Sequence, residues 1–315
     1  MPYLFSDNKK SPENFGAFRS GDGRNRTADT RIFSPLLYRL SYVTALTGLQ
    51  MYKKKTLREI ILLIFLIFTF VTDILMNLIL DIGNTLAKIA VYENNRKIDV
   101  VRVPHNDLQS QVDKIIATYN PKKAIVSNVS NLPIDLSGKG ISVLEFSHQT
   151  NLPVTINYKT PQTLGLDRIA LACGAKFHQQ KGNLLIIDAG TCITYDFVSN
   201  ANEYIGGAIS PGLNIRLKAM HHFTGKLPTT EFSEQLDEPA FIGKSTKECL
   251  LSGAFWGMVM EINGNISRYT QQFDEVYVFL TGGDANKFEK HVKNRIFANP
   301  FLLLDGLNYI LEFNS

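Results

Sequence analysis

The stretch "MNLILDIGNTLAKIAVY" at residues 76–92 decides the fold. It predicts a buried apolar strand that ends in Asp-Ile-Gly-Asn-Thr and is followed by an alternating strand. Gly83 allows a turn with positive φ and a close approach to a ligand. The amides of Gly83, Asn84 and Thr85 can then point at phosphate oxygens, as in other anion nests. A carboxylate repels phosphate, so Asp81 implies an intervening cation or an oriented water. One such turn alone is equally typical of a simple hairpin.

The same plan occurs twice. "NLLIIDAGTCITYDFVSNANEYI" at residues 183–205 repeats the strand, turn and strand of residues 77–99, with Asp188 107 positions after Asp81. A third strand ends in a Gly-Gly turn, "FLTGGDA", at residues 279–285. Two facing turns would hold a polyphosphate between two lobes. The repeat therefore predicts a duplicated half-domain rather than isolated hairpins.

The segments around the repeat alternate between helical and strand patterns. We expect helices at Leu108–Tyr119 and Asp167–Gln180, and further strands at Ala124–Ser127, Val143–Phe146 and Val276–Thr281. This alternation predicts an α/β fold.

Charge divides the chain at Met76. The net charge of the whole chain is +4, but residues 1–75 hold 11 Lys/Arg against 6 Asp/Glu, so the remainder is close to neutral. The main body thus lacks the basic surface expected for nucleic-acid binding. The three cysteines are too few and scattered for a disulfide framework or a CxxC metal site, which favours a reducing, cytoplasmic location.

Residues 1–75, the head of the chain, differ in sequence character from the remainder. Gly23–Tyr42 resembles the translation of an antisense tRNA gene, and the apolar run Ile61–Val71 is what AT-rich DNA yields when translated. We therefore expect the native chain to start at Met76, with residues 1–75 a non-native extension, disordered or poorly packed. A membrane anchor over residues 51–75 and a basic arm are the alternatives, although Asp73 interrupts the apolar run. Peptides from residues 20–70 in a cell extract would contradict the false start.

The turns and their neighbours resemble a known family. The two Asp-x-Gly-x-Thr turns and "FLTGGDA" are similar to the phosphate-1, phosphate-2 and adenosine motifs of the acetate kinase/sugar kinase/Hsp70/actin ATPase superfamily. "YKTPQTLGLDR" (158–168), "GGAISPG" (206–212), "GKLP" (225–228) and "GKSTKECLLSGAFWG" (243–257) follow in the order typical of type III pantothenate kinases. The resemblance covers residues 76–315. It implies two duplicated ribonuclease H-like lobes (76–181 and 182–315) with the active site in the cleft between them.

The resemblance also implies the chemistry: ATP-dependent phosphorylation of pantothenate to 4'-phosphopantothenate, the first step of coenzyme A biosynthesis. Mg²⁺ should accompany ATP, and Asp188 should bind a monovalent cation, K⁺ or NH₄⁺. The nucleotide-binding residues implied are Asp81, Ile82, Gly83, Asn84, Thr85, Leu86, Ala87, Lys88 and Thr191.

On the acceptor side, the resemblance implies that Asp167 is the general base for the pantothenate hydroxyl. The substrate contacts are expected from Tyr158, Gly165, Leu166, Asp167, Arg168 and Thr246. Thr246 should complete the pocket of a neighbouring subunit, so the enzyme is expected to be a homodimer. The helix at 252–269 is either an interface helix or a core helix, because Phe255, Met258, Val259 and Ile262 share one face.

Two other functions remain open on sequence alone. One keeps the fold and phosphorylates another small alcohol; the other is a non-catalytic, ATP-binding regulatory relative. "GKST" at 243–246 is not a P-loop, because Glu238 stands where that motif needs glycine.

Overall fold

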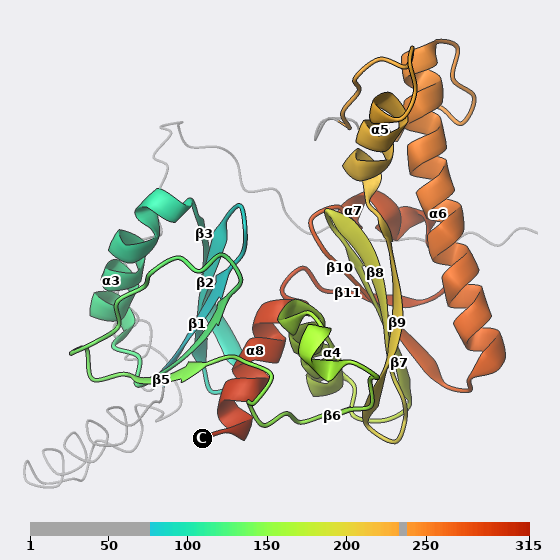
Figure 1. The fold of residues 1–315 in the computed structure, drawn as a ribbon. Coiled ribbons are helices and arrows are strands. Elements are labelled where there is room, and N and C mark those ends of the chain that lie inside the picture. Colours follow the sequence, from blue (N-terminus) through green and yellow to red (C-terminus); the bar gives the residue numbers. More distant parts are fainter. Residues whose placement is uncertain (1–75, 233–237) are drawn as a thin grey trace, which may run out of the picture. The chain divides into compact units, whose positions relative to one another are not determined.

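The computed structural model describes residues 76–232 and 238–315. The predictions about residues 1–75 lie outside the described residues. The strands are β1 (Met76–Ile82), β2 (Ala87–Glu93), β3 (Arg96–Val103), β4 (Lys123–Asn128), β5 (Ser142–Glu145), β6 (Thr155–Ile156), β7 (Asn183–Ala189), β8 (Cys192–Val198), β9 (Glu203–Pro211), β10 (Val276–Thr281) and β11 (Ile296–Ala298). The α-helices are α3 (Leu108–Tyr119), α4 (Leu166–His178), α5 (Leu213–His222), α6 (Thr246–Gln272), α7 (Ala285–Phe288) and α8 (Leu302–Phe313) (Figure 1).

Two sheets repeat one topology. The first has the strand order β3-β2-β1-β4-β5, and the second has β11-β10-β7-β8-β9-β6. In each, an antiparallel three-stranded meander is joined to two further parallel strands: β1 pairs with β4, and β7 with β10. The predicted duplication and the α/β class are confirmed.

The predicted elements are confirmed within a few residues. Helix α3 and strand β10 have the expected bounds, and helix α4 begins one residue before and ends two residues before its prediction. The division at residue 181/182 stays a prediction. The short strand β6 precedes it in sequence and pairs with β9 of the second sheet.

Strand alternation distributes the core side chains. On β1, Leu78 and Leu80 pack with α3, whereas Ile79 belongs to a cluster that also includes residues of β7, α4 and α8. Helix α8 contacts α4 and the strands β1 and β4. Because strands β1 and β7 are buried on both faces, their sequences are continuously apolar rather than alternating.

Helix α6 is a core helix on the face that the sequence singled out. Phe255, Met258, Val259 and Ile262 are all buried, and they pack against β7, β8 and β10 in the second hydrophobic cluster. The core interpretation is therefore correct for these four residues, and an interface would have to use another face of α6.

Candidate active site

In each repeat, strand periodicity places the aspartate on the strand face that meets one shared hydrophobic cluster. Ile79 and Asp81 share one face of β1, and Ile186 and Asp188 share one face of β7. Ile79 and Ile186 belong to one hydrophobic cluster. Asp81 and Asp188 are the penultimate residues of β1 and β7, and they therefore project towards the side that this cluster occupies.

Helix α4 adds a third carboxylate. Asp167 is in its first turn, after the N-cap residue Gly165, and its Oδ1 accepts a hydrogen bond from the Arg168 amide at 2.9 Å. Burial is the main cause that raises the pKa of both Asp81 and Asp188, and the charge of Asp167 adds to the rise in each. The structure thus brings three predicted site residues within electrostatic reach of one another.

The two equivalent aspartates differ in their partners. Asp81 lies opposite Lys88 on β2, with the Lys88 Nζ 3.5 Å from its Oδ2. Asp188 lies opposite Thr194 on β8, and no side-chain donor among the described residues contacts it. Burial, and then the charge of Asp167, raises the pKa of Asp188 to about 6. An unpaired, half-buried carboxylate of this kind is chemically suited to a bound cation.

The first turn is tighter than the sequence implied. Gly83 does not have a positive φ, so that expectation was wrong. Its N–H donates to the Leu86 carbonyl at 3.2 Å, and a Cβ at Gly83 would lie 3.2 Å from the same oxygen. The close approach within the turn, rather than a left-handed backbone, is what favours glycine here.

The predicted nucleotide residues divide by exposure. Asn84, Thr85 and Leu86 are exposed, whereas Ile82 and Ala87 are fully buried. The buried pair can contribute only backbone atoms to a ligand, because their side chains belong to the cluster beside α3.

The third predicted turn packs on the second. Gly282 has a φ of 100°, and a Cβ there would collide with the Ala189 carbonyl and with Asp188. The Asp284 amide donates to the Ala189 carbonyl at 2.8 Å, and the Gly212 amide donates to the Thr191 carbonyl at 3.1 Å. Glycine at 282 is thus required both by its backbone conformation and by the approach to the Asp188 turn.

Arg168 forms a buried ion pair that sequence reasoning missed. Its Nε lies 2.8 Å and its second guanidinium nitrogen 2.6 Å from Asp196 Oδ1, and Tyr204 and Thr194 also donate to Asp196. Burial by itself lowers the pKa of Arg168, but the hydrogen bond and charge of Asp196 raise it overall. The signal available in the sequence was a lone charge, Asp196, in the apolar strand "ITYDFV".

Tyr158 lies beside this ion pair. Its ring meets that of Tyr204 edge-on, with centroids 6.1 Å apart, and its proximity contributes to the raised pKa of Arg168. Gly206 has a φ of 119°, and a Cβ on it would lie 3.4 Å from the Tyr158 ring. The structure therefore groups Tyr158 with Arg168 at the start of α4.

Comparison with known proteins decides the family. A model described as type III pantothenate kinase matches residues 77–268. The chain belongs to the type III pantothenate kinase family. Type III pantothenate kinases from Phocaeicola vulgatus and Christiangramia forsetii are 40% and 42% identical over 244 residues, which cover 76% of this chain and 99% of each relative.

A solved structure of low sequence identity also matches this chain. Component A of (R)-2-hydroxyglutaryl-CoA dehydratase from Acidaminococcus fermentans is 12% identical, with a TM-score of 0.43, and the match covers 76% of this chain and 97% of that one.

One predicted site residue of the pantothenate kinase stands apart. Thr246 is exposed in the first turn of α6, where Ser245 caps the helix by accepting from the Glu248 amide at 3.3 Å. The structure records no contact between Thr246 and the other predicted site residues within the described part of the chain.

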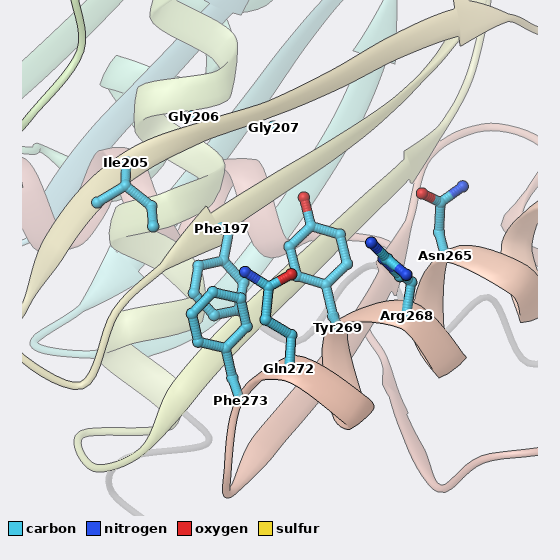
Figure 2. Close-up of a pocket in the computed structure, with 9 residues that line it drawn as sticks. All are labelled: Phe197, Ile205, Gly206, Gly207, Asn265, Arg268, Tyr269, Gln272 and Phe273. Atoms are coloured by element: carbon cyan, nitrogen blue, oxygen red, sulfur yellow. The ribbon is translucent and has the colours of Figure 1, made fainter.

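A separate cavity of about 360 Å³ lies between β9 and the second half of α6 (Figure 2). Phe197, Tyr269 and Phe273 pack together on its floor, and Arg268 lines its edge. None of the residues predicted for the pantothenate kinase site lines it, so this cavity is distinct from the aspartate turns.

Two features are absent from the described ranges. These ranges contain no group of three or more His, Cys, Asp or Glu residues that could hold a metal ion. No helix among residues 76–232 and 238–315 is long and apolar enough to cross a membrane.

Proposed function

We propose that this chain transfers the γ-phosphoryl group of ATP to the hydroxyl of pantothenate, forming 4'-phosphopantothenate for coenzyme A biosynthesis. The observation that carries the proposal is the placement of Asp167. It stands at the start of α4, within electrostatic reach of the strand-end aspartates Asp81 and Asp188. A base next to a phosphate-binding turn is what phosphoryl transfer to an alcohol requires.

The nucleotide would bind at the two repeated turns. The exposed Asn84 and Thr85 would offer amides to phosphate oxygens, and Lys88 would supply positive charge beside Asp81. Thr191, exposed after β7, would contact the nucleotide from the second turn.

The cations would complete the negative cluster. Asp188 would hold a monovalent cation, K⁺ or NH₄⁺, and Mg²⁺ would arrive with the ATP phosphates. The raised pKa of Asp188 and the absence of a side-chain donor to it within the described residues support a cation ligand at this position. Bound cations would neutralise charge that develops on the transferring phosphoryl group.

Pantothenate would bind beside α4. Asp167 has one carboxylate oxygen engaged by the Arg168 amide, and the other is available to accept the hydroxyl proton. Tyr158 and the amides of Gly165 and Leu166 would orient the acceptor. Arg168 would contribute positive charge from within its pair with Asp196, since its guanidinium is already engaged there.

We further propose that the enzyme is a homodimer in the cytoplasm. The outer face of α6 exposes Gly253, Met260 and Gly264, and a Cβ at either glycine would meet nothing within 4 Å. This flat, partly apolar face suits close packing of a second copy, which would bring Thr246 to the neighbouring pocket. The free thiols of Cys173, Cys192 and Cys249 support a reducing compartment.

The full-length chain, assayed with ATP, Mg²⁺ and K⁺, tests the acceptor. Pantothenate and a panel of small alcohols would be compared, with the product identified by mass spectrometry. Formation of 4'-phosphopantothenate from pantothenate, with the other alcohols at least tenfold slower, is expected. Phosphorylation of another alcohol in preference would support the alternative kinase, and ATP binding without any transfer would support a regulatory relative. Replacing K⁺ with Na⁺ should lower the rate.

A further inference from the structure

Two histidines donate hydrogen bonds to backbone carbonyls next to the proposed substrate turns. His105 Nε2 lies 2.9 Å from the Gly83 carbonyl oxygen, and His148 Nε2 lies 2.8 Å from the Leu164 carbonyl oxygen. A carbonyl oxygen can only accept, so Nε2 carries the hydrogen in both rings. Gly83 opens the first phosphate turn, and Leu164 precedes Gly165 and the acceptor helix α4.

The bond from His105 fixes the direction of an amide in the phosphate turn. The C=O and N–H of one trans peptide point in opposite directions. With the Gly83 carbonyl held by His105, the N–H of Asn84 points away from the histidine. Neither the Asn84 nor the Thr85 amide donates to another residue in the described part of the chain. The amide of Asn84 is thus held in place and left available for a phosphate oxygen.

The hydrogen bond from His148 likewise fixes the direction of one peptide group, at the acceptor turn. With the Leu164 carbonyl held, the N–H of Gly165 points away from His148. The Leu164 side chain is buried, so the residue is also anchored from its own side. Gly165 caps α4, and its carbonyl accepts from Ile169 in the first turn at 3.2 Å. The direction of this one peptide therefore sets how α4 begins and where Asp167 stands.

Both histidines sit on rigid turns. Pro104 precedes His105, and its carbonyl accepts from the Asp107 amide at 3.0 Å. His148 lies inside the turn Ser147–Thr150, which is closed by a backbone bond of 3.1 Å and by a bond of 3.0 Å from the Ser147 amide to Thr150 Oγ1. Neither histidine belongs to the predicted site, and each reaches its carbonyl from a separate loop.

We infer that His105 and His148 are positioning residues for the two substrates, His105 for the nucleotide and His148 for the acceptor. The inference rests on the proposed function for the identity of the substrates. Each histidine orients one peptide from behind and leaves the catalytic step to other groups. Loss of either bond should therefore weaken the use of one substrate and spare the other.

The test uses matched substitutions in the full-length chain. The amide nitrogen of glutamine can occupy the place of Nε2, whereas asparagine is too short to reach the carbonyl. His105→Asn should raise KM for ATP roughly five- to tenfold, the effect of one neutral hydrogen bond, and leave KM for pantothenate within twofold. His148→Asn should raise KM for pantothenate by a similar factor and leave KM for ATP within twofold. His105→Gln and His148→Gln should stay within about twofold of wild type on both constants.

Each variant is the control for the other, and unfolding midpoints verify that all are folded. His105→Phe and His148→Phe, which keep a ring without a donor, take over if an asparagine variant does not fold. Equal changes in both KM values, or no change in either, would overturn the inference. An inactive wild type would instead defeat the proposed function. In that case, direct ATP titration of wild type and of His105→Asn would test the role of His105. Unchanged affinity for ATP would overturn that role.

Discussion

Two aspartates in this protein, the buried Asp305 and the half-buried Asp188, have opposite surroundings. Asp305 on α8 accepts hydrogen bonds from Tyr92 Oη at 2.6 Å, from His178 Nε2 at 2.8 Å and from Asn299 Nδ2 at 2.8 Å. Asp188 at the end of β7 has no side-chain donor among the described residues. Burial by itself raises the pKa of Asp305, but its three partners lower it overall, whereas burial and Asp167 raise the pKa of Asp188 to about 6.

The difference separates a structural carboxylate, Asp305, from the proposed functional carboxylate, Asp188. Asp305 links α8 to β2, through Tyr92, and to α4, through His178, so its charge is satisfied within the fold. Burial, and then the charges of Asp167 and Asp81, raise the pKa of Asp188, and Lys88 is the positive side chain paired with Asp81 beside it. The proposed cations and substrate would stabilise such a carboxylate, and strongly shifted pKa values of this kind are typical of functional sites.

Removing the partnered charge should give the largest loss of stability. Asp305→Asn leaves donors from two elements without a carboxylate, and we expect the free energy of unfolding to fall by about 3 kcal/mol at pH 7. Urea unfolding followed by circular dichroism measures this. A loss below about 0.5 kcal/mol would mean that the three hydrogen bonds do not hold α8 in place.

Removing the unpaired charge of Asp188 should instead increase stability. Asp188→Asn relieves the desolvation that raises the pKa to about 6, so the free energy of unfolding of the apo protein at pH 8 should rise by about 2 kcal/mol. Activity should fall at least tenfold, because the proposed cation ligand is lost. A variant that is both less stable and fully active would contradict the distinction between the two aspartates.

The two substitutions should also respond to pH in opposite directions. The folded pKa of Asp305 is depressed, so its stabilising contribution is present above its unfolded pKa of about 4 and is lost as pH falls through the folded value. The folded pKa of Asp188 is raised, so its favourable contribution is present below about 4 and is lost as pH rises through about 6. Unfolding free energies from pH 3 to 8 for wild type and both variants measure the trends; parallel curves would refute them.

A single donor should have the smallest effect. Tyr92→Phe removes only the hydroxyl that donates to Asp305 and keeps the buried ring, so we expect a loss of about 1 kcal/mol. Tyr277→Phe is a matched control, since its hydroxyl makes no hydrogen bond to the described residues. Equal losses in both variants would show that the Asp305 bond contributes nothing particular.

Sequence predicted the local features and missed the long-range ones. The repeated apolar strand and Asp-x-Gly-x-Thr turn were sufficient for the duplicated sheets, because strand pattern and turn residues are local signals. The partner of Arg168, Asp196, is 28 residues away and on another element. The positive φ expected at Gly83 was wrong; instead, the turn brings the Leu86 carbonyl close to the Gly83 Cα, so that a Cβ would lie 3.2 Å from that oxygen.

The network around Asp305 illustrates the same limit. Its members, among them Tyr92, His178 and Asn299, come from parts of the chain up to 213 residues apart. No periodicity links them, since they meet only when α8 packs against both α4 and β1. Buried polar partners of this kind are specified by tertiary packing rather than by any local pattern.

The rate of 4'-phosphopantothenate formation by Asp167→Asn, compared with that of wild type, tests whether Asp167 is the general base. Asparagine keeps the shape of the side chain and removes its ability to accept the hydroxyl proton. We expect a fall in kcat of roughly 10²- to 10⁴-fold, with ATP affinity retained and unfolding free energy equal to or above that of wild type. Undiminished turnover by Asp167→Asn would contradict the assignment of Asp167 as the base in this carboxylate cluster.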